Sequence, residues 1–381
     1  MTTGTDALQG DEFAEEILKP WQRIGRSLLQ DRFAMWGAVV LVFFFALAIV
    51  GWWVTSGDDP YFSPSTIRLP DRLKPPMAKP NLEDVAPDKL PPLGIYPFGT
   101  DELGRDVFAR MLEGSKIAMA VGFVAVGISM ILGVFLGGIA GFHGNKHIGP
   151  ASLLGAILFP VAGGFLFSEI SWWILFPLEG ALLFIGVVLG MWVESLPAFG
   201  FLKRHPIVNV DTIFIVLVDV QLSFPTFFLI LTAIAVLPPS IWNIMVVIGI
   251  TGWVGPARFV RAEILSLKER PFIEAARAIG AKDMRLIIIH LVPNSLAAVL
   301  VSVTIGVPLA ILSEAGLSFL GFGVPPPDAS WGNILSDGRK FLFDAPWLMF
   351  IPGFAILIVV LAFNLFGEGL RDALNPRTRP E

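Results

Sequence analysis

The sequence of 381 residues contains no cysteine, only four histidines and few charged residues. Without cysteine the chain cannot form disulfides, cysteine-ligated zinc sites, iron–sulfur clusters or a thiol nucleophile, although this does not identify a redox compartment. Four scattered histidines leave little material for a metal centre, so we expect no metal site, no cofactor and no catalytic residue. Charged side chains make up 15% of the residues, whereas ordinary globular domains have about 25%.

A phosphate-binding loop is also missing. The sequence has no Gly-Lys dipeptide and therefore cannot contain the G-x-x-x-x-G-K-[ST] motif that cradles nucleotide phosphates. Any use of ATP must belong to a partner chain. The net charge of −5 gives no reason to expect nucleic acid as a partner.

Apolar residues are abundant, at 54% of the chain, and the mean hydropathy is +0.71. A soluble fold of this length could not bury so much apolar surface, whereas a lipid bilayer can solvate it. Each long apolar run can cross a core of about 30 Å as a helix. The sequence therefore predicts an all-α polytopic membrane protein with about eight spans, at 33–54, 117–141, 151–167, 172–193, 212–235, 240–257, 294–313 and 347–367.

The distribution of charge predicts the orientation of these spans. Basic residues precede the first span and acidic residues follow it, so the positive-inside rule places the N-terminal segment 1–32 in the cytoplasm. The first apolar run is too long for a cleavable signal. Eight crossings return the tail, 373–381, to the cytoplasm.

Residues 55–116 are predicted to form an external loop that is rich in proline. Its last part predicts an amphipathic helix, because Phe108, Met111 and Leu112 fall on one face. This helix either lies in the membrane interface or packs, solvated, on the outer surface of the protein.

The segment 258–290 is charged, with seven Lys or Arg against four Asp or Glu, and predicts a cytoplasmic helical element. Pro271 suits the first turn of a helix, and Gly280 permits a bend after it. Between them, four apolar side chains predict one face of the helix: Phe272, Ala275, Ala276 and Ile279. Such an element fits a groove on a partner protein or forms a solvated intracellular loop.

Several ordered motifs resemble one family. The residues Glu274-Ala275-Ala276, Gly280 and Leu291-Val292-Pro293 resemble the EAA loop of ABC importer permeases. Other segments resemble the C-type permease subunit of dipeptide and oligopeptide importers: YPFGTDELGRDV at 96–107, SEAGLSFLG at 313–321, SWGN at 330–333, APW at 345–347 and NLFGEGLRD at 364–372. The resemblance covers about 33–142 and 207–377.

The resemblance implies a permease that imports peptides across the bacterial inner membrane and is not itself an enzyme. It implies a six-span core paired with a second permease, two cytoplasmic ATPases that hold ATP and Mg, and an external solute-binding protein. In this interpretation the loop 258–290 couples the spans to an ATPase, and Gly280 sets its bend. The implied coupling residues are Glu274, Ala275, Ala276, Arg277, Gly280 and Ala281.

The chain departs from the family pattern at 146–206, within the permease domain 117–372. Two apolar stretches there predict an inserted membrane hairpin, where relatives have a short cytoplasmic loop. A hairpin crosses the membrane twice and so preserves the topology downstream. The insertion weakens any close inference about the substrate.

Two other classes remain open from the residues alone. An ion-driven transporter needs ionisable residues within its spans, and Asp219 and Glu179 are the main examples here. A membrane-embedded enzyme needs a cluster of reactive residues, and the sequence shows none. Copurification with ATPase subunits would separate a permease from both classes.

Overall fold

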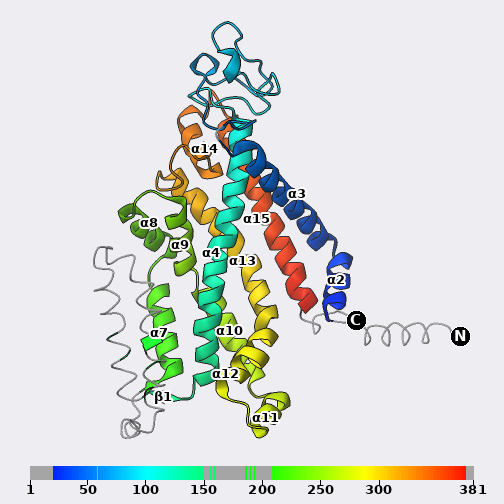
Figure 1. Ribbon diagram of the computed structural model, residues 1–381, viewed down its shortest axis with the longest axis vertical. Helices are drawn as coiled ribbons and strands as arrows, with labels where there is room; N and C mark the ends of the chain where they lie inside the picture. The colour runs from blue at the N-terminus through cyan, green and yellow to red at the C-terminus, as the bar shows by residue number, and fades with distance from the viewer. Residues whose placement is uncertain are drawn as a thin grey trace, which may run out of the picture.

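The computed structural model describes residues 20–57, 59–148 and 208–374, with a few isolated positions between 149 and 207. Over these ranges the regular structure is helical, apart from an antiparallel pair of two-residue strands, β1 (His147–Ile148) and β2 (Val208–Asn209) (Figure 1). The all-α prediction is therefore confirmed. The helices are α2 (Pro20–Gln30), α3 (Arg32–Thr55), α4 (Val107–His143), α7 (Val210–Leu222), α8 (Thr226–Val236), α9 (Ile241–Thr251), α10 (Val254–Leu267), α11 (Pro271–Ala278), α12 (Asp283–Arg285), α13 (Val292–Phe319), α14 (Trp331–Gly338) and α15 (Trp347–Leu374).

Five helical segments of the described residues are long and apolar enough to cross a membrane. They are α3, α4, the combined α9–α10 segment, the part of α13 from Val299, and α15. The pair α7 and α8 adds a sixth span if it crosses as one unit with its bend of 76°. These six match predicted spans. The two others, at 151–167 and 172–193, lie outside the described residues, so the total of eight stays a prediction.

The helix expected at the end of the external loop is not a separate element. Asp106 caps α4 by accepting a hydrogen bond from the backbone N–H of Phe108 at 2.8 Å. The helix then runs unbroken for 37 residues, or about 55 Å, and so extends beyond a bilayer core. Met111 and Leu112 are buried, so these two side chains face the interior of the protein.

Helix α4 forms the centre of the molecule and packs against α3, α9, α10 and α13 (Figure 1). Glycine allows the closest of these approaches. A Cβ added at Gly133 would lie 2.5 Å from Cβ of Pro256 in α10, and one added at Gly37 would lie 2.7 Å from the carbonyl oxygen of Ala362 in α15. Small residues at helix contacts are the usual way in which membrane helices gain packing energy.

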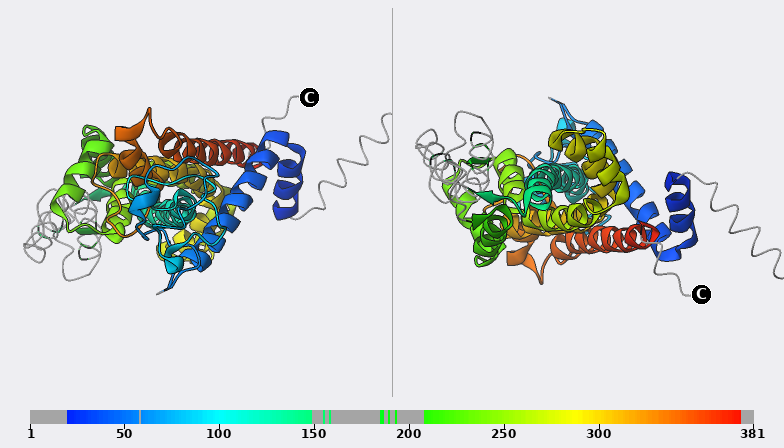
Figure 2. Two further views of the ribbon diagram at one scale, coloured as in Figure 1. Left: turned by 90° about the horizontal axis from the view of Figure 1, so that it is seen from above. Right: turned by 90° about the horizontal axis from the view of Figure 1, so that it is seen from below.

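The helix bundle has two different sides. Helices α3 and α15 lie on the side opposite α7 and α8 (Figure 2). The exposed side chains of α3 and α15 form an apolar surface that suits lipid, and they include Val39, Val42, Phe43, Ile49, Phe350, Phe354 and Leu357. The side formed by α7, α8, α10 and α13 exposes charged and hydroxyl side chains, such as Asp219, Thr226 and Arg258, together with apolar ones such as Val216 and Phe228.

Candidate functional site

Helices α11 and α12 stand at one end of the molecule, which we call the α11 end, far from α14 and the loop 59–106 at the α14 end (Figure 1). Pro271 occupies the first turn of α11 after an extended residue, Arg270. The helix closes at Gly280, whose φ of +88° suits glycine. The N–H groups of Gly280 and Ala281 return to the carbonyl oxygens of Arg277 and Ala276 at 2.9 and 3.0 Å. This is a Schellman-type end, and the predicted bend is present.

The apolar face predicted for α11 is divided in the structure. Ala276 is buried with Ile273, and both pack in a cluster with side chains of α4, α10 and α13. Phe272, at 43% exposure, and Ile279, at 87%, remain exposed. The prediction that all four residues share one face is wrong for Ala276, because 273 and 276 form the stripe next to 272, 275 and 279 on the helix.

The six predicted coupling residues therefore have different surroundings. Glu274, Ala275 and Gly280 are exposed, Ala276 is buried, and Ala281 is partly buried against the cluster that holds Ala276. The guanidinium carbon of Arg277 lies 5.6 Å from the ring centroid of Phe142 at the end of α4, which is cation–π range.

The segment is also tied to α4 by charge. Asp283, in α12, accepts a hydrogen bond from Nζ of Lys146 at 2.9 Å, and Nε2 of His143 lies 3.9 Å from the same carboxylate oxygen. Burial raises the pKa of Asp283, but the hydrogen bond from Lys146 and the surrounding positive charge outweigh it and lower the pKa overall. Sequence reasoning missed Phe142, Lys146 and Asp283.

A cavity of about 340 Å³ opens between the spans, and we call it the break cavity. Its walls come from α4, α7, α8, α9, α10 and α13, and it lies where two spans are interrupted, at the bend between α7 and α8 and at the turn between α9 and α10. The amide nitrogen of Gln221 donates to the carbonyl oxygen of Thr251 at 2.5 Å and joins the two interruptions. The polar residues that line the break cavity are Ser129, Gln221, Thr226, Thr251, Arg258, Ser302 and Ser313.

Two arginines of α10 differ in their partners. Arg261 makes a bidentate ion pair with Asp211 of α7, with N–O distances of 2.6 and 2.7 Å. Arg258, almost one turn earlier, has no ion pair and no hydrogen bond in the described part of the chain. Arg258 and Asp219 line a second cavity beside the first without forming an ion pair. Asp219, a candidate from the sequence, therefore lies near charged residues, and sequence reasoning missed Arg258.

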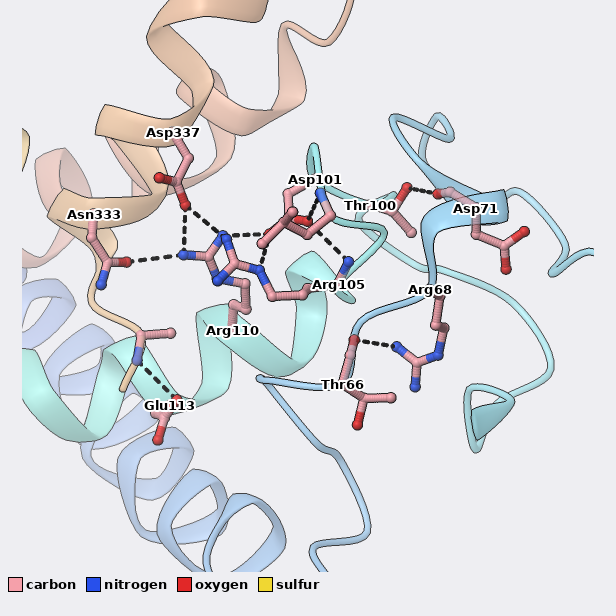
Figure 3. Close-up of polar contacts among 12 residues, drawn as sticks. Thr66, Arg68, Asp71, Thr100, Asp101, Arg105, Arg110, Glu113, Asn333 and Asp337 are labelled. Atoms are coloured by element: carbon pink, nitrogen blue, oxygen red, sulfur yellow. Dashed lines mark hydrogen bonds and ion pairs between the residues drawn. The ribbon is translucent and has the colours of Figure 1, made fainter. Parts of the chain in front are cut away.

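At the α14 end, two arginines and two aspartates form a largely buried network (Figure 3). Arg110 donates to Asp101 at 2.6 Å and to Asp337 at 2.9 Å, while Arg105 donates to the same carboxylates at 2.7 and 3.1 Å. Asn333 accepts from Arg110 at 3.2 Å. The network fastens the loop before α4 to α14, and its charges balance.

Three of the motifs found in the sequence meet at this end of the molecule. Asp101 and Arg105 belong to the segment 96–107, and Asn333 belongs to the segment 330–333. The indole of Trp347 donates to the carbonyl oxygen of Thr100 at 3.2 Å. These motifs, far apart in the sequence, therefore form one polar joint between the loop 59–106 and the spans.

Two family models match the chain. The model described as binding-protein-dependent transport system inner membrane component matches residues 186–380. The model described as N-terminal TM domain of oligopeptide transport permease C matches residues 19–76.

Curated relatives match over nearly the whole length. A dipeptide transport system permease protein, DppC, of Alkalihalophilus pseudofirmus is 32% identical over 95% of this chain and 91% of its own. The oligopeptide transport system permease protein OppC of Bacillus subtilis is 29% identical over 98% of this chain and 95% of its own. Among solved structures, an inward-facing MetNI methionine ABC transporter chain covers 68% of this chain and 96% of its own, with a TM-score of 0.31 and 16% identity.

Proposed function

Because the chain belongs to the family of binding-protein-dependent transport system inner membrane components, we propose that it is one of two permeases in an ATP-driven importer of dipeptides or oligopeptides. It is a multi-pass inner-membrane permease component, not an enzyme. The peptide substrate follows the dipeptide and oligopeptide permeases that it resembles along nearly its whole length. A second permease, two ATPases and an external solute-binding protein complete the transporter.

One observation supports coupling through α11 above all. The helix presents Phe272, Ala275 and Ile279 outward, while Ile273 and Ala276 anchor it to the ends of the spans. Exposed apolar side chains at this spacing are typical of a helix that lies in a groove of a partner. Glu274, on the same exposed surface, supplies a charge that orients the contact.

The contacts of α11 give a route by which a partner's motion reaches the spans. The Arg277–Phe142 and Lys146–Asp283 contacts join this segment to the end of α4. The π-helical turn at Leu286–Leu291 continues directly into α13. A displacement of α11 would therefore act on two spans that wall the break cavity. Energetic coupling of this kind is typically about 1–3 kcal/mol.

In this proposal the α11 end faces the cytoplasm and the α14 end faces outward. The excess of basic residues in 258–290 supports this orientation. ATP and Mg are held by the partner ATPases, and the loop 59–106 with α14 forms the outer surface on the side of the binding protein.

Substitutions in α11 and at its end test the coupling directly. Gly280→Asp adds a side chain where φ is +88° and places a charge at the contact surface, and Glu274→Lys reverses a charge there. We expect both variants to insert and to pair with the second permease, yet to lose most of the ATP hydrolysis that loaded binding protein stimulates, together with transport. The measurement is transport and ATPase activity in reconstituted complexes.

Lys282→Arg serves as the control, because it keeps the charge and we expect near wild-type transport. Wild-type stimulation in both Gly280→Asp and Glu274→Lys would disprove coupling through α11. Purification of the tagged chain without any ATPase subunit would instead favour an ion-driven transporter.

A further inference from the structure

Helices that break inside a membrane protein need water, protein or ligand around the break, because lipid cannot satisfy exposed backbone groups. Two such interruptions meet at the break cavity, between α7 and α8 and between α9 and α10. In transporters, discontinuous helices of this kind surround substrate sites. The residues that line the cavity come from α4, α7, α8, α9, α10 and α13 or the turns between them, and none belongs to α3 or α15.

Arg258 is the one charged side chain among the described residues that line the break cavity. It is exposed, and it has no hydrogen bond or ion pair in the described part of the chain. A cationic side chain within a spanning segment is costly unless it faces water or an anion. Since Arg261 nearby is already paired with Asp211, Arg258 is left for an anionic group that the described residues do not provide.

Asp219 is the closest alternative partner, because it lines the second cavity together with Arg258. The two side chains nevertheless form no ion pair, and Asp219 does not line the break cavity. Arg258 therefore contributes positive charge to the break cavity without a carboxylate beside it there.

We propose that the break cavity receives the C-terminal end of the transported peptide and that Arg258 binds the peptide's terminal carboxylate. This rests on the proposed function as a peptide permease. A guanidinium matches a carboxylate with two parallel hydrogen bonds. The walls suit the rest of such a ligand, because Ile230, Ile248 and Leu309 are apolar and the hydroxyls of Ser302 and Ser313 can bond to peptide groups.

The size of the cavity agrees with part of a peptide rather than a whole one. Its volume of about 340 Å³ lies at the lower end of the range of small-molecule sites, roughly 300–1,000 Å³. One or two C-terminal residues would fill it, and the rest of a longer peptide would extend toward the second permease. Positive charge in the pathway then selects peptides that have a free terminal carboxylate. It discriminates little between peptides with different side chains.

The absence of cysteine from this chain permits a direct test in the whole purified complex. Thr226→Cys places a single thiol on an exposed residue of the cavity wall, and Leu357→Cys places one on the apolar surface of α15 as a control. Labelling of this subunit by an anionic and a cationic methanethiosulfonate is followed by mass spectrometry. We expect labelling only at position 226, about three- to tenfold faster for the anionic reagent, and loss of that preference when Arg258→Gln is added.

Protection by peptides identifies the group that Arg258 binds. We expect trialanine to slow labelling at position 226, trialanine amide to protect at least about tenfold less well, and Arg258→Gln to abolish the difference while Arg258→Lys keeps part of it. Equal protection by both peptides, or a difference between them that survives Arg258→Gln, would overturn the carboxylate site. Absence of labelling at position 226 would overturn the cavity as an aqueous site.

Asp219→Asn distinguishes a ligand site from an ion pair that forms only in the assembled complex. If Thr226→Cys alone shows no preference for the anionic reagent and adding Asp219→Asn creates one, Asp219 neutralises Arg258 in a structural pair and the proposal fails. Copurification and ATPase stimulation of the cysteine variants report on the proposed function separately. Normal copurification and normal ATPase stimulation would therefore support the proposed function even if the carboxylate site were disproved.

Discussion

Arg110 lies between both aspartates of the network at the α14 end and is almost completely buried (Figure 3). Asp101, its partner, is fully buried. Replacing such a pair by apolar residues is often neutral, but removing one partner leaves a charge that water cannot reach. Removing Arg110 would leave Asp101 and Asp337 with Arg105 alone, so the cost of the substitution comes from one uncompensated negative charge.

Arg110→Met should lower the stability of the complex by about 3–5 kcal/mol, the range for breaking a buried pair. Arg371→Met is the control, because Arg371 forms an exposed pair with Asp372 at 4.0 Å, and such pairs contribute about 0–1 kcal/mol. Thermal unfolding of the purified complex measures both variants. Equal losses in the two variants would show that the network contributes no more than a surface ion pair.

At the scale of the element, α4 depends on a buried cap. Asp106 accepts the first free N–H of the helix from Phe108, and burial raises the pKa of its carboxyl to about 6. The folded state therefore holds the proton more tightly than the unfolded chain, whose carboxyl has its ordinary pKa of 3.8. The free energy of unfolding therefore falls as the pH rises from about 4 to about 6, because the buried carboxyl of Asp106 loses its proton and becomes charged.

Asp106→Asn should keep the cap and remove the buried charge, since both side chains serve well at this position. At pH 7.5 we expect the Asn variant to be as stable as the wild type or more stable. At pH 5 the stability of the wild type relative to Asp106→Asn should be greater than it is at pH 7.5. Asp106→Ala loses the cap and should be destabilised by about 1 kcal/mol at pH 7.5. Melting temperatures at the two pH values measure this, and a pH-independent difference between Asn and wild type would contradict the raised pKa.

For the whole molecule, the orientation proposed above predicts which positions face each side of the membrane. Tags at residues 1, 147, 204 and 381 should be cytoplasmic, and tags at 75, 170 and 330 should be external. Accessibility to an impermeant reagent in intact cells measures this. A cytoplasmic position 170 together with an external position 75 would show that the hairpin predicted at 146–206 does not cross the membrane.

Local chemistry and periodicity determined much of this protein in advance. A long apolar run has one stable form in lipid, so the five candidate spans that the structure describes, and the bent pair α7 and α8, were predictable. Pro271 and Gly280 act through their own backbone restrictions and freedoms, so both ends of α11 were predictable as well. The family resemblance was likewise readable, because its motifs are contiguous in the sequence.

Only the tertiary structure decided which side chains meet. The continuity of α4 from Val107, the inward face of Ala276 and the joining of Arg110 to Asp337 all depend on how distant helices pack. The free guanidinium of Arg258 depends on this too, since Arg258 and Arg261 look alike in sequence and differ only in what α7 brings beside them. Periodicity assigns a residue to a face of its own helix, but the neighbour of that face is set by the packing of the whole bundle.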